Sequence, residues 1–392
     1  MQSITLHSGK QKSILRRHPW IFSGAIKVKP KVVDGDLVRV LDAKGNFLCI
    51  GMWQNGSIAV RIISFFETDI DEKYWNSKIA AAFELRKKLR LVDSNQTNCY
   101  RLIHAEGDGL PGLIIDIYGS SAVIQCHSIG MSLQKEKIAK SLKSILGDKI
   151  SSIFDKSSNT LPKRFAAEIK DEYLLSGSST ADYVLENGHK FKVNFEEGQK
   201  TGFFLDQREN RQLLTQYCAG KSVLNAFCYS GGFSVYALAA GAASVDSLDI
   251  SKKAIDWTHQ NVGLMEGFDG QHDAKAVDVM DFLKNTDKKY EIVVVDPPAF
   301  AKSFGKRHNA VQGYKRLNAM ALKKVEKGGI LFTFSCSHVV DRVLFRNTIA
   351  SAAMEVGRNV RVLHQMSQPA DHPISLFHPE GSYLKGLVLG VD

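Results

Sequence analysis

The feature that most constrains the fold is a regular alternation of apolar strands and helices that begins near residue 220. Short runs rich in Val, Ile and Leu, such as 222–226 and 290–295, are each followed by a turn and a stretch with helical spacing. Strands that are apolar throughout are typical of a parallel sheet covered on both faces, with right-handed crossover helices. The sequence therefore predicts an α/β fold with a doubly wound sheet, whose ligands bind at the carboxyl ends of the strands.

The chain before this alternation reads as two smaller parts. Up to about residue 66, apolar and polar residues alternate around turns such as 43–46, which predicts a small β-barrel or half-barrel. Residues 72–91 carry a helical apolar stripe, and residues 99–175 mix strands with a helix near 133–146. A chain of 392 residues is also longer than one ordinary core supports. We expect a β domain at 1–70, a small α+β domain at 71–185 and the doubly wound domain at 186–392.

Charge and composition narrow the partners of the protein. The net charge is +10, and the first 50 residues carry nine Lys or Arg against three Asp, which favours a polyanion such as a nucleic acid. The sequence shows neither a membrane-length apolar run nor a signal-peptide core, so we expect a cytoplasmic protein without a membrane partner. The six cysteines lack C-x-x-C spacing and predict reduced thiols with no bound metal.

Glycines and carboxylates mark the first three strand ends of the sheet. Gly231 and Gly232 in the turn after the first strand remove side chains where the backbone must approach a ligand. The spacing is not G-x-G-x-x-G, which favours a ligand without a pyrophosphate. Asp249 ends the second strand, where a carboxylate accepts hydrogen bonds from ribose hydroxyls. Together the glycine turn and Asp249 indicate a nucleoside site. Asp278 follows the third strand and either accepts from an adenine amino group or caps the next helix; the sequence leaves both readings open.

Asp296 and Cys336 stand at the ends of the fourth and fifth strands. Pro297 and Pro298 follow Asp296 directly, and two prolines fix the backbone that holds this carboxylate at the edge of the sheet. A single crossover helix between the two strands would make them neighbours, with ends about 5 Å apart. A cysteine by itself is usually a small buried hydrophobe. Beside Asp296, however, Cys336 is predicted to face the same pocket and to take part in the chemistry.

At these residues the chain resembles the S-adenosylmethionine-dependent methyltransferases with a Rossmann-like sheet, and more closely the large-subunit 23S ribosomal RNA cytosine-5 methyltransferase family with an N-terminal PUA domain. The resemblance covers essentially the whole chain and rests on HPWIFSGAI, HAEGDGLPGLIIDIYG, EGQKTGFFLDQRENR, NAFCYSGGFS, DPPAF, FSCS and DHPISLFHPEGSYLKGL. It implies S-adenosylmethionine as the cofactor, 23S ribosomal RNA as the partner and an RNA-binding PUA module in the first domain. A homodimer is left open.

The resemblance also implies which residues hold the cofactor. They are Phe227, Gly231, Asp249, Asp278 and Asp296. In this arrangement Asp249 would hold the ribose and Asp278 would lie near the adenine. The segment 199–211 is implied to cover the cofactor, with a solvated hairpin as its alternative.

By the same resemblance, Cys336 is the nucleophile and Asp296 contacts the target base. Further substrate contacts are expected at Pro297, Pro298, Phe300 and Lys302. Phe300 either stacks on the base or belongs to the core. The loop from 301 to 316 contains Lys302, Lys306, Arg307, Lys315 and Arg316, which form either a rim that contacts phosphates or a plain solvated loop.

Two departures from related enzymes concern thiols. Another RNA cytosine-5 family has a second cysteine directly after the proline pair, where this chain has Ala299, so product release here cannot use that thiol. Cys228, in the first glycine turn, is a rival reactive thiol that we rank below Cys336.

The implied chemistry is covalent catalysis on a pyrimidine. Carbon 5 of cytosine becomes nucleophilic when a thiolate adds to carbon 6, and Asp296 would hold the base edge and donate or share a proton at the ring nitrogen. A thiol with a pKa near about 8.5 needs help to ionise at pH 7, and we expect this help from the cationic sulfonium and Lys302. The alternatives are methylation of an exocyclic amine on adenine or guanine, which needs no thiol, and a ribosome-assembly factor without enzymatic activity.

Overall fold

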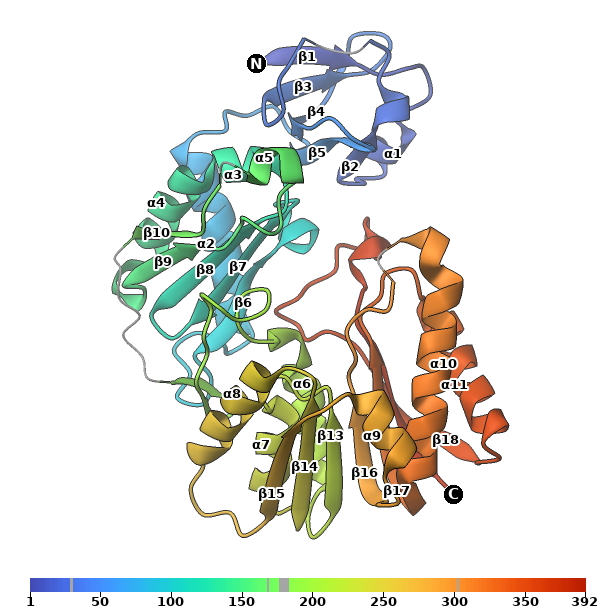
Figure 1. The fold of residues 1–392 in the computed structure, drawn as a ribbon. Coiled ribbons are helices and arrows are strands. Elements are labelled where there is room, and N and C mark those ends of the chain that lie inside the picture. The colour runs from blue at the N-terminus through green and yellow to red at the C-terminus, as the bar shows by residue number, and fades with distance from the viewer. Residues whose placement is uncertain (29–30, 168, 176–182, 302) are drawn as a thin grey trace. The chain divides into compact units, whose positions relative to one another are not determined.

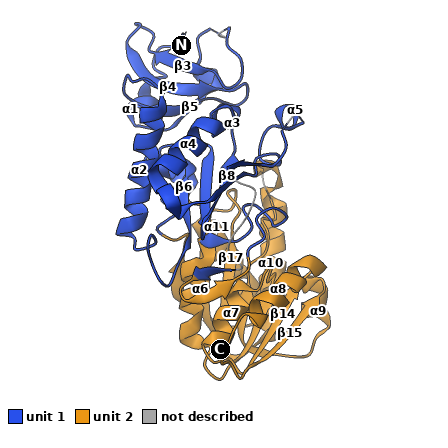
Figure 2. Ribbon diagram, turned by 90° about the vertical axis from the view of Figure 1, so that its left-hand side faces the viewer, with its two compact units in different colours: residues 1–185, 193–205, 370–381 blue, residues 186–192, 206–369, 382–392 orange. Residues whose placement is uncertain are grey.

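The computed structural model describes residues 1–28, 31–167, 169–175, 183–301 and 303–392 (Figure 1). The chain forms two compact units, which Figure 2 shows in different colours. Unit 1 comprises residues 1–185, 193–205 and 370–381, and unit 2 comprises residues 186–192, 206–369 and 382–392. None of the helices in the described ranges combines the length and the hydropathy that crossing a membrane requires.

Unit 1 begins with a five-stranded sheet, as the alternation before residue 66 predicts. In spatial order its strands are β1 (Gln2–Thr5), β3 (Leu37–Leu41), β4 (Phe47–Trp53), β5 (Ile58–Ser64) and β2 (Trp20–Phe22). The short helix α1 (Lys12–Leu15) lies between β1 and β2 in the chain. The predicted turn at 43–46 joins β3 to β4, and the Asp42 carboxylate accepts hydrogen bonds from the backbone N–H of Lys44 and Asn46 at 2.8 and 2.9 Å.

The second sheet of unit 1 confirms the predicted α+β pattern. Its strands are β10 (Glu172–Leu175), β9 (Ser152–Asp155), β8 (Ser121–Cys126), β7 (Leu113–Tyr118) and β6 (Cys99–His104). The predicted helices are α2 (Glu72–Lys88) and α4 (Lys135–Leu146), and the shorter α3 (Ile129–Leu133) and α5 (Lys163–Ala166) accompany them. Trp75 and Ile79 of α2 share one apolar core with Leu142 of α4 and Ile115 of β7. The amphipathic stripe read from the sequence is therefore the buried face of α2.

A hairpin of β11 (Val184–Glu186) and β12 (His189–Phe191) precedes the seven-stranded sheet of unit 2. The strands of that sheet are β15 (Gln271–Ala276), β14 (Ser244–Asp249), β13 (Ser222–Ala226), β16 (Tyr290–Val295), β17 (Val325–Ser335), β19 (Lys385–Val391) and β18 (Val360–Met366). The first five run parallel, as predicted. The sheet is not parallel throughout, however, because β19 is antiparallel to β17 and to β18. The chain passes from β18 to β19 without a crossover helix, and such a connection returns the strand in the opposite direction.

The helices of unit 2 cover the sheet as a doubly wound fold requires. They are α6 (Arg208–Leu214), α7 (Gly232–Ala239), α8 (Lys252–Gly263), α9 (Val279–Asn285), α10 (Arg307–Lys324) and α11 (Arg342–Glu355). Strand β13 pairs with both β14 and β16, so the strand order reverses at this point (Figure 1). Right-handed crossovers then place α7 and α8 on one face and α9, α10 and α11 on the other. The carboxyl ends of β13 and β16 consequently meet at the switch point of the sheet.

Candidate functional site

The turn after β13 is held in an unusual backbone conformation. Phe227, Tyr229 and Gly231 have φ angles of 63°, 49° and 77°, in the left-handed region that side chains other than glycine rarely adopt. Such a conformation costs on the order of 1–3 kcal/mol per residue other than glycine, and it clusters at ligand sites. The Asp249 carboxylate holds the turn, since it accepts the Tyr229 N–H at 3.0 Å and the Ser251 N–H at 2.9 Å. Phe227, Gly231 and Asp249, all predicted to bind the cofactor, therefore lie at adjacent strand ends.

Close packing, as well as the backbone conformation, favours glycine at position 231. A Cβ atom at this position would lie 2.7 Å from Cγ2 of Thr258, on α8, and a Cβ atom at Gly232 would lie 3.0 Å from Cδ of Arg211. The sequence attributed these glycines to a close approach of the backbone to a ligand. In the structure, the groups that approach them are protein side chains.

Asp278 caps helix α9. Its exposed side chain accepts the backbone N–H of Asp281 at 3.0 Å, which is the contact of an N-cap. Of the two readings that the sequence left open, the structure shows this one. The contact with adenine stays a prediction.

Asp296 and Cys336 follow neighbouring strands, as expected from the single crossover helix between them. Val295 of β16 pairs with Thr333 of β17 in parallel register, so Asp296 and Cys336 come just after the ends of adjacent strands. The loops that follow β16 and β17 are also joined by a hydrogen bond, which the Ser337 hydroxyl donates to the carbonyl of Ala301 at 2.8 Å.

Tyr314 of α10 is a neighbour of both the thiol and the carboxylate. Burial raises the pKa of its phenol, and the negative charges of Cys336 and Asp296 raise that pKa further. Both groups therefore lie within electrostatic reach of one buried side chain. The sequence offered no signal for Tyr314 beyond its place in a helix.

The six cysteines differ in their exposure. Cys336 is partly exposed, whereas Cys49, Cys99, Cys126, Cys218 and Cys228 are buried. Burial raises the pKa of the Cys228 thiol to about 12. The rival thiol is thus protonated at neutral pH, and this supports the ranking of Cys336 above it.

Gln207 is a site residue that was not singled out from the sequence. Its side-chain amide donates to Oδ2 of Asp296 at 2.9 Å, and Asn210 donates to the Gln207 carbonyl oxygen at 2.6 Å, which orients the amide. Both belong to the segment 199–211 that was predicted to cover the cofactor. One of the described contacts of this segment is therefore with the carboxylate that is expected to hold the target base.

The expected substrate contacts are placed as follows. Pro297 is buried and Pro298 is exposed. The Phe300 ring packs against the Tyr314 ring, with the centroids 4.6 Å apart, and it is partly buried against the apolar core that contains Tyr314. This packing supports the core alternative for Phe300, and stacking on a base stays a prediction. Lys302 lies outside the described residues.

Part of the predicted phosphate-contacting rim is helical and ion-paired. The residues from Arg307 onward belong to α10 rather than to a loop. Arg307 pairs with Asp341 at 3.1 Å, and Lys315 pairs with Glu355 at 2.8 Å. Contact with RNA phosphates would have to compete with these pairs.

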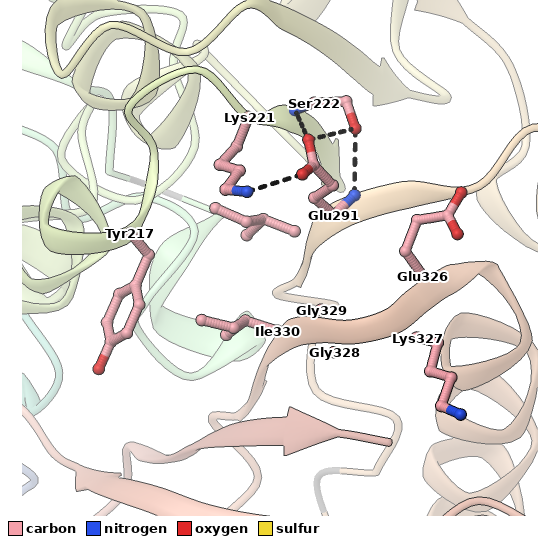
Figure 3. A pocket seen from close by; sticks show the side chains of 10 residues that line it. Tyr217, Lys221, Ser222, Glu291, Glu326, Lys327, Gly328, Gly329 and Ile330 are labelled. Atoms are coloured by element: carbon pink, nitrogen blue, oxygen red, sulfur yellow. Dashed lines mark hydrogen bonds and ion pairs between the residues drawn. The ribbon is translucent and has the colours of Figure 1, made fainter.

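A cavity of about 530 Å³ lies at the opposite end of the sheet (Figure 3). It is lined by the first residues of β13 and β16 and by residues 326–330 of β17, and the Lys221–Glu291 ion pair of 2.8 Å closes one side. In sheets of this kind ligands bind at the carboxyl ends of the strands. We therefore do not assign this cavity to the site.

One group of described residues has the composition of a metal site. In unit 1 the ligand atoms of His18, His378 and Glu380 lie within 4.8 Å of one another, and the Glu380 carboxylate is 3.6 and 3.7 Å from the two imidazoles. Ligands of a single zinc ion, bound at about 2.0–2.2 Å, lie no more than about 4.4 Å apart. The Glu380 carboxylate already contacts both imidazoles, and no metal is assigned to the three groups.

Comparison with known proteins agrees with the fold. A model of the S-adenosylmethionine-dependent methyltransferases matches residues 152–373, and a model of PUA-like domains matches residues 4–65. A methyltransferase structure from Streptococcus mutans, 22% identical, covers all of both chains with a TM-score of 0.85, which shows the fold. A second methyltransferase structure with the same TM-score is a complex with SAH.

Two relatives extend the match over the full length of the chain. The ribosomal RNA large subunit methyltransferase I of Pseudoalteromonas atlantica is 39% identical over 394 residues, covering 99% of each chain. The protein of that name from Aeromonas hydrophila is 38% identical over 398 residues, covering 99% of this chain and 98% of its own. The chain therefore belongs to the S-adenosylmethionine-dependent methyltransferases, in the family whose members are named ribosomal RNA large subunit methyltransferase I.

Proposed function

We propose that this protein methylates carbon 5 of a cytosine in the RNA of the large ribosomal subunit, with Cys336 as the covalent nucleophile and Asp296 as the residue that holds the base. The observation that carries the proposal is the placement of these two residues after adjacent strands, in loops that the Ser337–Ala301 hydrogen bond ties together. The names of the relatives support ribosomal RNA as the substrate.

The burial of the cysteines supports the choice of nucleophile. A thiol attacks as the thiolate, and burial in an apolar environment keeps a thiol protonated. Burial raises the pKa of Cys126, Cys218 and Cys228 to about 12, whereas Cys336 is the partly exposed cysteine at a strand end.

The cofactor fits the carboxyl ends of β13 and β14. Phe227 and Gly231 in the strained turn, together with the Asp249 carboxylate, would hold S-adenosylmethionine, with Asp278 at the next strand end near the adenine. When bound, S-adenosylmethionine supplies an electrophilic methyl group.

The residues of this chain carry the rest of the reaction. The Cys336 sulfur bonds to carbon 6 of the cytosine, and the electron pair of the 5–6 double bond makes carbon 5 nucleophilic. Asp296, oriented by Gln207, holds the base edge and shares a proton with the ring nitrogen as negative charge builds there. After carbon 5 has been methylated, loss of its proton to a base restores the double bond and expels the Cys336 thiolate.

The target cytosine must leave its stack to reach this site. Unstacking costs a few kcal/mol, and the cost is lowest in a single-stranded or looped region of the RNA. The PUA-like domain, with nine Lys or Arg against three Asp in the first 50 residues, would hold the surrounding RNA through its phosphates.

The test uses the full chain and an RNA fragment of the large subunit in which cytosine is replaced by 5-fluorocytosine. Fluorine at carbon 5 cannot leave as a proton does, so the wild type should remain covalently bound to this RNA and migrate as an adduct in denaturing gels. Cys336→Ala should form no adduct and no 5-methylcytosine. Cys218→Ala is the matched control, because Cys218 is buried in the same unit, and it should retain both.

A Cys336→Ala variant that methylates ribosomal RNA at the wild-type rate would contradict the proposal. Mass spectrometry of the nucleosides would then distinguish methylation of an exocyclic amine on adenine or guanine. Absence of methylation by the wild type, together with absence of S-adenosylmethionine binding in calorimetry, would point to an assembly factor.

A further inference from the structure

A buried lysine lies beside the proposed nucleophile. Lys385 is the first residue of β19, and its backbone pairs with Ser335, the residue before Cys336. Its side chain is only 4% exposed. The antiparallel strand β19 thus brings a cation from the end of the chain to the strand end that carries the thiol.

Two hydrogen bonds fix the position of the lysine nitrogen. Nζ of Lys385 donates to the carbonyl of Ser337 at 2.6 Å and to the carbonyl of Tyr383 at 2.6 Å. Ser337 directly follows Cys336, so the first bond ties the nitrogen to the turn that holds the thiol. The second bond ties it to Tyr383, two residues before β19, and the nitrogen cannot swing out to solvent without breaking both.

The charges of Lys385 and Cys336 are close enough to interact. Burial lowers the pKa of Lys385 to about 8, and the negative charge of Cys336 opposes this shift. At neutral pH the nitrogen is therefore still mainly an ammonium. The interaction is reciprocal, because a thiolate that favours the ammonium is itself favoured by it.

The other charged groups around Lys385 come from the start of α11. Arg342 donates to the carbonyls of Met366 and Leu384 at 2.9 and 3.2 Å and lowers the pKa of Lys385, whereas Asp341 raises that pKa. These two neighbours act in opposite directions. On the side of the thiol, the charged group among the described residues that acts on Lys385 is Cys336 itself.

From this geometry we infer that Lys385 is a positioning residue whose ammonium stabilises the Cys336 thiolate and so sets the fraction of the nucleophile that is ready to attack. The thiol proton passes to water, and the lysine keeps its own. This inference rests on the proposed function, in which Cys336 acts as a thiolate. Lys302, which was predicted from the sequence to provide this help, lies outside the described ranges.

The test measures the rate of alkylation of Cys336 by iodoacetamide across the neutral and alkaline pH range, with the modified peptide identified by mass spectrometry. Iodoacetamide reacts with the thiolate, so the midpoint of the rate profile reports the thiol pKa. For Lys385→Met, which keeps the length and removes the charge, the midpoint should rise by about one to three pH units. Lys385→Arg, which keeps the charge, should stay closer to the wild type.

Lys143 provides a matched control in unit 1. Its Nζ also donates to two backbone carbonyls, those of Gly147 and Ile150 at 2.8 and 3.1 Å, and it pairs with Asp148 of the same unit. Lys143→Met should leave the alkylation profile unchanged. An unchanged profile in a folded Lys385→Met protein, as judged by its melting temperature, overturns the inference.

A reciprocal measurement covers the case in which Lys385→Met does not fold. In Cys336→Ala the ammonium loses its anionic neighbour, so an NMR titration of the Lys385 amine should give a lower pKa than in the wild type. An equal pKa in the two proteins overturns the inference. Neither measurement needs RNA or cofactor, so the two proposals can fail separately. A shifted alkylation profile in Lys385→Met supports the interaction between Lys385 and Cys336. Methylation by Cys336→Ala at the wild-type rate would overturn the proposed function instead.

Discussion

Replacement of Gly231 by alanine tests whether the turn after β13 depends on the packing of α8. The φ angle of 77° costs a residue other than glycine about 1–2 kcal/mol. The added Cβ atom would lie 2.7 Å from Cγ2 of Thr258, and overpacking of this kind costs about 1–3 kcal/mol. The two effects predict that Gly231→Ala lowers the free energy of unfolding by about 2–5 kcal/mol.

Gly241 is the matched control for the backbone effect alone. Its φ angle is 81°, and the nearest atom to an added Cβ is the Ala219 Cα at 4.0 Å. Gly241→Ala should therefore cost only the conformational part, about 1–2 kcal/mol. The difference between the two variants, measured by urea denaturation, isolates the contact with Thr258.

A double-mutant cycle identifies the atom responsible. Thr258→Ser removes Cγ2 but keeps the hydroxyl, which donates to the carbonyls of Tyr229 and Ala254 at 2.9 and 3.1 Å. Combined with Gly231→Ala it should recover part of the lost stability, and calorimetric titration with S-adenosylmethionine should show a parallel recovery of affinity. Equal losses in Gly231→Ala and Gly241→Ala, or no recovery in the double mutant, would refute the reasoning.

Two further predictions concern unit 1. The Asp108 carboxylate accepts hydrogen bonds from both terminal nitrogens of the fully buried Arg86, at 2.6 and 2.9 Å. Asp108→Asn leaves the guanidinium charge uncompensated and should lower the free energy of unfolding, measured by urea denaturation, by about 3–5 kcal/mol. A decrease below about 1 kcal/mol would contradict this reasoning. Burial, reinforced by the charge of Arg101, lowers the pKa of His104 well below its ordinary value, so below a pH of about 6.5 the unfolded chain binds a proton that the folded protein does not. The free energy of unfolding should therefore decrease as the pH falls below about 6.5, by up to about 1.4 kcal/mol per pH unit. In His104→Gln this dependence on pH should be weaker. Equal slopes in the two proteins would show that His104 is not responsible.

Much of the site follows from local pattern and topology. The apolar runs identify five parallel strands, and a single crossover helix between 290–295 and 325–335 is enough to make those strands neighbours. Asp296 and Cys336 could be paired in advance for this reason. Asp249 could likewise be placed beside the Gly231 turn, because parallel strands present their carboxyl ends at one edge of the sheet.

The sequence by itself thus determined the five parallel strands of the sheet and the two residues on which the proposed chemistry depends, because strand periodicity and crossover handedness act over short stretches of chain. Only the tertiary structure decided the environment of these residues. The burial that keeps Cys228 protonated, the amide of Gln207 on Asp296 and the ammonium of Lys385 near Cys336 all come from segments distant in sequence. The reactivity of a thiol depends on the dielectric and the charges around it, and these exist only once the remote segments have packed.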